Sequence, residues 1–81
     1  MNKFKLGDTV YFACIDDGIL KLIACSVKEI RLSKSKRISY TLQLTENPEN
    51  EISIDENDLF HSEKEAIINL QLQLEELSKK L

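Results

Sequence analysis

The spacing of the apolar residues changes at Ser62, and this change constrains the fold more than any other feature of the sequence. After Ser62 the apolar residues recur at intervals of three and four, which is typical of a helix with one buried face. Before it they alternate with polar ones, a period typical of a half-buried strand; the clearest case is Ile38, Tyr40, Leu42 and Leu44. The sequence therefore predicts a sheet followed by one helix.

Three further segments are predicted to be strands: residues 9–15, 19–32 and 51–55. Asp16, Asp17 and Gly18 separate the first two segments, and Gly18 adopts a positive φ at little cost, so this turn predicts a hairpin. A two-residue loop would pair Phe12 with Ile23, and a three-residue loop would pair it with Leu22. Both registers place apolar residues opposite each other, so the register stays open.

The segment 19–32 has fourteen residues, whereas strands usually have about five or six. We expect it to bend near residues 24–26, where the side chains are small, and to be shared between two parts of the sheet, as in small barrels. The predicted fold class is α+β, mainly β: a bent barrel of four to five antiparallel strands with one C-terminal helix. A single domain is expected over 1–81, with the barrel in 1–60 and the helix in 61–81.

Residues 4–11, Phe-Lys-Leu-Gly-Asp-Thr-Val-Tyr, resemble the opening of small SH3-like barrels, including KOW- and Tudor-type modules. In these a glycine turn delivers the first core valine, here Val10, into the barrel. Residues 59–66 are similar to the barrel-to-helix junction of small uncharacterised bacterial and phage proteins. The resemblance implies an SH3-like fold that binds peptides, nucleic acids or modified side chains, and it implies no activity.

The sequence has no motif for nucleophilic catalysis and no glycine-rich phosphate loop, so we expect no enzymatic activity and no cofactor. His61 is the only histidine, and a calcium loop beginning at Asp55 would have Phe60 where glycine is needed, so no metal site is expected. Cys14 and Cys25 lie in apolar strand segments and are interpreted as structural.

No apolar run approaches the ~18 residues of a membrane span, and the first residues do not form a signal peptide. We therefore expect a cytoplasmic protein with no membrane partner. The net charge of −3 is unevenly distributed, with +4 over residues 1–37 and −7 over residues 38–81. Such asymmetry bears on partners rather than on fold.

One candidate surface is a basic cluster in the segment 28–37. In a barrel these residues would lie at one strand end and its loop, a suitable edge for phosphates, so nucleic-acid binding is the alternative function. The acids of 46–58 suggest a different role, because an acidic surface fits the nucleic-acid channels of other proteins, as in an inhibitor encoded by a mobile element. The candidate macromolecule-binding residues are Lys28, Arg31, Lys34, Lys36 and Arg37.

The second candidate surface is the helix, whose main apolar stripe occupies one ~100° sector while two apolar residues lie on a nearly opposite face. Three interpretations stay open: two apolar residues are simply exposed, the helix touches the barrel and another chain, or its end pairs with its copy. The predicted function is a non-enzymatic protein-binding module, a small adaptor or inhibitor, with a homodimer as a further prediction. The candidate helix interface is Ile68, Leu72, Leu74, Leu77 and Leu81.

Overall fold

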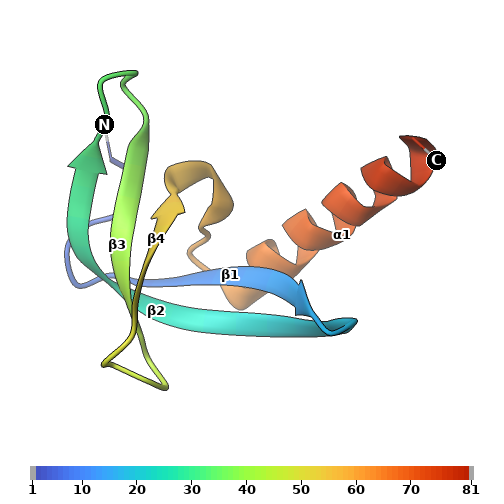
Figure 1. The fold of residues 1–81 in the computed structure, drawn as a ribbon, viewed down its shortest axis with the longest axis horizontal. Helices are drawn as coiled ribbons and strands as arrows, with labels where there is room; N and C mark the ends of the chain where they lie inside the picture. The colour runs from blue at the N-terminus through green and yellow to red at the C-terminus, as the bar shows by residue number, and fades with distance from the viewer. Residues whose placement is uncertain (1, 81) are drawn as a thin grey trace.

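A computed structural model describes residues 2–80, which form one four-stranded antiparallel sheet followed by a helix (Figure 1). The strands are paired in the order β1-β2-β3-β4, and the predicted α+β, mainly β fold class is confirmed. The elements are β1 (Thr9–Asp16), β2 (Ile19–Leu32), β3 (Ile38–Leu44), β4 (Glu51–Asp55), the 3-10 helix η1 (Glu56–Asp58) and α1 (Glu63–Lys80).

The hairpin between β1 and β2 has a two-residue loop, which is one of the two possibilities that the sequence left open. Phe12 pairs with Ile23, and Val10 pairs with Cys25. Asp17 and Gly18 have φ values of 53° and 75°, and positive φ at both loop positions matches the right-handed twist of the strands. The turn chemistry therefore sets the register along the whole hairpin.

β2 is bent and pairs with two strands on its two edges. Its first part pairs with β1 and its second part with β3, and both pairings include Cys25 and Ser26. A register shift follows between Val27 and Glu29, which places a bulge immediately after the small residues where the bend was predicted. The bend lets one strand belong to two differently oriented parts of the sheet.

The sheet is open: within residues 2–80 no ladder joins the edge strands β1 and β4. A single antiparallel bridge does connect β1 to the chain that follows η1. In it the Tyr11 N–H donates to the Phe60 carbonyl at 2.9 Å, and the Phe60 N–H donates to the Tyr11 carbonyl at 3.0 Å. This bridge holds the start of α1 beside β1.

The core lies within the curve of the sheet and is covered by the N-terminal segment. The ring of Phe4 packs edge-on against that of Tyr40, with 5.4 Å between the ring centroids. The Tyr40 hydroxyl accepts a hydrogen bond from the Phe4 N–H and donates one to the Glu56 carboxylate. The buried apolar cluster comprises Phe4, Val10, Cys25, Val27, Tyr40, Leu42 and Leu59.

α1 begins at the predicted cap, since the Ser62 hydroxyl accepts a hydrogen bond from the Glu65 N–H at 3.2 Å. The helix packs mainly on β1, and Ala66 is buried there. Residues 71–79 are all exposed, so the second half of α1 extends beyond the sheet. In Figure 1 this half of α1 and the turn end of the β1–β2 hairpin project to the same side of the molecule and diverge.

Candidate protein-binding surface

The predicted basic cluster is largely paired with acids. Lys28 donates to Glu51, whose hydrogen bond raises the pKa of the Lys28 ammonium above its usual value. The Nε atom of Arg37 lies 3.8 Å from Oδ2 of Asp55. The Nε atom of Arg31 lies 3.6 Å from Oε2 of Glu29, two residues earlier in β2. Of the five candidate residues, Lys34 and Lys36 lie in the exposed turn between β2 and β3.

The predicted acidic segment is likewise partly used within the fold. Glu51 pairs with Lys28 of β2, and Asp55 pairs with Arg37, which directly precedes β3. Glu56 accepts hydrogen bonds from the Tyr40 hydroxyl and, at 3.0 Å, from the Lys3 N–H, and these bonds hold the pKa of its carboxyl below the usual value. The two charged segments are therefore adjacent, and they compensate each other across the outer face of β2, β3 and β4.

The predicted helix interface is exposed wherever the structure describes it. Leu72 and Leu77 are 55% and 58% exposed, and Ile68 and Leu74 are each 44% exposed. Leu81 lies outside the described residues. At 3.6 residues per turn, Leu74 and Leu77 lie on the side of α1 that carries the buried Ala66, whereas Ile68 and Leu72 lie on the nearly opposite side.

The turn end of the β1–β2 hairpin was not identified from the sequence as a surface. Ile15, Ile19 and Leu20 are large apolar residues that flank the turn and stay exposed. The available signal was the length of β2, because a fourteen-residue strand at about 3.3 Å per residue is longer than a small sheet can cover. The excess strand had to project from the sheet, together with the residues next to the turn.

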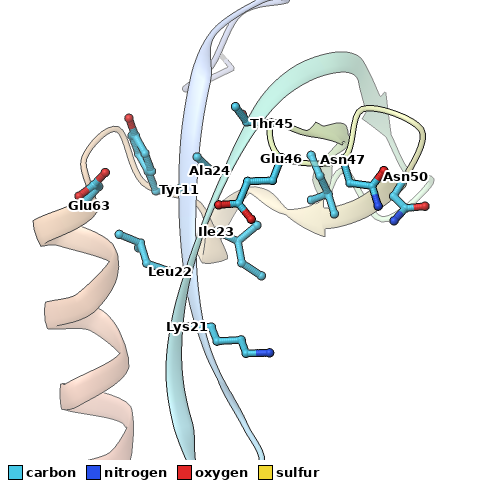
Figure 2. Close-up of a pocket in the computed structure, with 11 residues that line it drawn as sticks. Tyr11, Lys21, Leu22, Ile23, Ala24, Thr45, Glu46, Asn47, Asn50 and Glu63 are labelled. Atoms are coloured by element: carbon cyan, nitrogen blue, oxygen red, sulfur yellow. The ribbon is translucent and has the colours of Figure 1, made fainter.

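The apolar side chains of the hairpin end and of α1 are directed toward each other. Leu22 points from β2 to the side on which α1 lies (Figure 2). Leu20 shares this face because strand residues two apart point the same way, and Ile15 shares it as the cross-strand partner of Leu20. We call Ile15, Leu20, Leu74 and Leu77 the hairpin–helix surface.

Two cavities lie beside this surface. One, of about 270 Å³, lies between β1 and α1, and its lining includes Ala13, Ala66 and Gln73. The other, of about 610 Å³, has Tyr11, Leu22 and Glu63 on the side of β2 that faces α1, while Lys21, Ile23 and Glu46 lie on the other side (Figure 2). Because its lining divides around β2, this second space is not a single chamber for one small ligand.

His61 and Cys25 both make contacts within the fold. The ring of His61 packs against Phe4, with 4.6 Å between the ring centroids. Burial raises the pKa of the Cys25 thiol to about 11, which keeps it protonated and unreactive. Within residues 2–80 there is no group of three or more side chains arranged to hold a metal ion.

In the part of the chain that the structure describes, no helix combines the length and the apolar character that crossing a bilayer requires. Comparisons with protein-family models, with curated proteins and with solved structures give no match to this chain.

Proposed function

We propose that the protein is a non-enzymatic protein-binding module that uses the hairpin–helix surface. One observation carries this proposal: nine large apolar side chains among the described residues are exposed, and four of them, Ile15, Leu20, Leu74 and Leu77, make up the hairpin–helix surface. They project from the sheet on two elements whose apolar faces are directed toward each other. A concentration of exposed apolar side chains of this kind marks a surface that another macromolecule covers.

The fold supports the same proposal. The strand β2, bent and shared by β1 and β3, and the bridge from Phe60 back to Tyr11 are features expected of an SH3-like barrel. We propose this fold type for the sheet, and such barrels are binding modules. The two free thiols, Cys14 and Cys25, are in keeping with a reducing compartment such as the cytoplasm.

A protein partner is better supported than a nucleic acid. Three of the five basic candidates, Lys28, Arg31 and Arg37, lie beside acids, which reduces their attraction for phosphates. The inhibitor role suggested by the acidic segment loses support for the same reason, because Glu51 and Asp55 are among those acids. The apolar residues of the hairpin–helix surface have no such partners.

The proposal is tested by capturing partners from the source cell with the tagged full chain and with two variants. Leu20→Asp places a charge within the hairpin–helix surface, and Leu72→Asp places the same charge on the opposite side of α1. A protein that binds the wild type and Leu72→Asp but not Leu20→Asp, and that repeats this order when purified, supports the proposal. Equal binding to all three, or no binding protein, contradicts it.

A further inference from the structure

We propose that the open edge of β1 beside α1 takes an extended segment of another protein, which adds to the sheet as a further strand. This inference rests on the proposed function, because it describes how a protein partner binds next to the hairpin–helix surface, to which Ile15 of β1 also belongs. Two observations lead to it: the unpaired backbone groups on the outer edge of β1, and the lining of the cavity between this edge and α1.

The outer edge of β1 carries backbone groups that are free to pair. Tyr11 exchanges both backbone hydrogen bonds of the bridge with Phe60, so its N–H and its carbonyl point away from β2. In an antiparallel pair alternate residues direct these groups to the same side, so those of Ala13 and Ile15 also point away from β2. Within residues 2–80 neither Ala13 nor Ile15 has a backbone partner on this side. The edge therefore offers two consecutive pairing sites beyond the bridge.

The chain itself shows which kind of partner this edge accepts. At the first site, Tyr11, the partner is Phe60, which follows Leu59 in an extended conformation with φ −115° and ψ 148°. The residues before Leu59 form η1, so the chain does not continue along the edge to Ala13. An extended segment that lies next to Phe60 and antiparallel to β1 meets the donors and acceptors of Ala13 and Ile15. This is the geometry of strand addition at an open sheet edge.

The cavity of about 270 Å³ adjoins the first of these two sites. Ala13 is part of its lining, and α1 contributes the side chains of Asn69 and Gln73 on the opposite side. Amide side chains both donate and accept hydrogen bonds, so they suit the second edge of a strand that lies between β1 and α1. Because α1 and the end of the hairpin diverge (Figure 1), the space between them widens toward Ile15.

The edge of β4 is less suited to strand addition. The Leu44 N–H donates to the Asn50 carbonyl, so by the same alternation the N–H and carbonyl of Ser53 point away from β3. Ser53 stands between Glu51 and Asp55, and charged side chains on an edge strand oppose the addition of another strand. The middle of β1 carries no charged residue, so this protection is absent from the edge beside α1.

The charge of the lining favours a basic residue in the added segment. Asp58 is the only charged residue that lines the cavity. No base in residues 2–80 forms an ion pair with its carboxylate. A lysine or arginine of the added segment that faces Asp58 gains an attraction there, whereas a glutamate is repelled. The expected occupant is therefore an extended segment with a basic residue and without acidic ones.

The first measurement uses a displayed library of short random peptides, selected on the immobilised full chain, and a selected peptide is then titrated in solution. Ala13→Pro removes the outward N–H and places a proline ring on the edge, a change that an edge strand tolerates. It should weaken peptide binding by at least about tenfold. Ser53→Pro is the matched control, because it makes the same change on the edge of β4, and it should bind the peptide like the wild type. Circular dichroism shows whether each variant is folded.

The second measurement changes the peptide and leaves the protein as it is. A strand added to an edge directs alternate N–H groups toward that edge, so N-methylation of one alternate set of peptide residues should abolish binding. N-methylation of the other set should reduce binding much less. Replacement of the basic peptide residue by glutamate should weaken binding further, and Asp58→Asn should remove this preference for a basic residue.

The absence of any peptide that binds this chain and not an unrelated protein overturns the inference, as does equal loss of binding from the two sets of N-methylated residues. A peptide that Ser53→Pro weakens as much as Ala13→Pro does also overturns it. If the wild type forms a dimer that Ala13→Pro dissociates, the occupant is a second copy and the inference fails. If Leu20→Asp loses a captured protein that Ala13→Pro retains, the inference fails and the proposed function stands. If the chain captures no protein and binds no peptide, both fail.

Discussion

The two ends of the molecule use apolar residues in opposite ways. At one end Tyr40 and Leu42 are completely buried beneath the N-terminal segment, and the polar atoms there have hydrogen-bond partners within the chain. At the other end the hairpin turn and the second half of α1 carry apolar residues that stay exposed. The comparison indicates that the first end provides folding stability, whereas the second end is the surface that we propose for binding.

The largest expected effect is that of Leu42→Ala at the packed end. The substitution leaves a cavity in the core and should lower the free energy of unfolding by about 2–5 kcal/mol. Leu72→Ala, on the exposed helix, should change it by no more than about 0.5 kcal/mol. Chemical denaturation measures both values. Comparable losses for the two variants would remove the distinction between the packed and the projecting ends.

Tyr40→Phe should have the next largest effect, because it removes a hydroxyl that both donates and accepts within the core. The Phe4 N–H and the Glu56 carboxylate each lose a partner, and the free energy of unfolding at neutral pH should fall by about 1–3 kcal/mol. Denaturation of the wild type and of Tyr40→Phe, measured at neutral pH, checks this value.

The same variant predicts a pH dependence. In the folded chain the donated hydrogen bonds of Tyr40 and Lys3 hold the pKa of the Glu56 carboxyl below its ordinary value of 4.5. This contribution to stability is therefore present above the unfolded pKa and is lost as the pH falls through the folded pKa. The difference between the wild type and Tyr40→Phe should shrink over that range in acid. A difference that stays constant with pH would show that Glu56 is not involved.

A smaller loss of unfolding free energy is expected for a substitution in the turn of the hairpin. Gly18 has a φ of 75° with open space where a Cβ would lie, so Gly18→Ala costs only the backbone strain, about 1–2 kcal/mol. Asp17→Asn is the control, because asparagine also tolerates the positive φ of that position. If the hairpin end is separate from the core, hydrogen exchange in Gly18→Ala should increase near the turn and not at Leu42. Increased exchange throughout would show that the two ends unfold together.

Local patterns predicted much of this fold because short-range physics decides those features. The alternation in β3, the cap at Ser62 and the glycine turn each depend on neighbouring residues, and each is present in the structure. The length of β2 predicted its bend, and the bulge beside Val27 supplies it. The predicted bent barrel is not confirmed, because the sheet is open and β1 is joined to Phe60 by one bridge. Pairing of this kind depends on contacts between distant segments, which local patterns do not contain.

The candidate surface was less predictable for the same reason. The basic cluster could be seen in the sequence, but its neutralisation depends on Glu51 and Asp55 in a strand two positions away in the sheet. The exposure of Leu20 depends on how far the hairpin extends past α1, and this distance cannot be predicted from a local sequence pattern. The stripe on α1 was visible because helical periodicity is local. The part of the molecule that lies opposite this stripe could not be predicted, because it depends on contacts between distant segments.

The smallest effect is expected in the basic segment 28–37, where the quantity measured is the affinity for oligonucleotides. It compares this segment with the hairpin–helix surface. If paired charges remove the attraction for phosphates, oligonucleotides should bind weakly at low salt and lose this binding at moderate salt. Lys34→Glu, in the unpaired turn, should weaken the residual binding slightly, whereas Leu77→Asp should leave it unchanged. Fluorescence titration with single- and double-stranded oligonucleotides measures these affinities. Tight binding at moderate salt that Lys34→Glu abolishes would instead make the edge formed by residues 28–37 the functional surface.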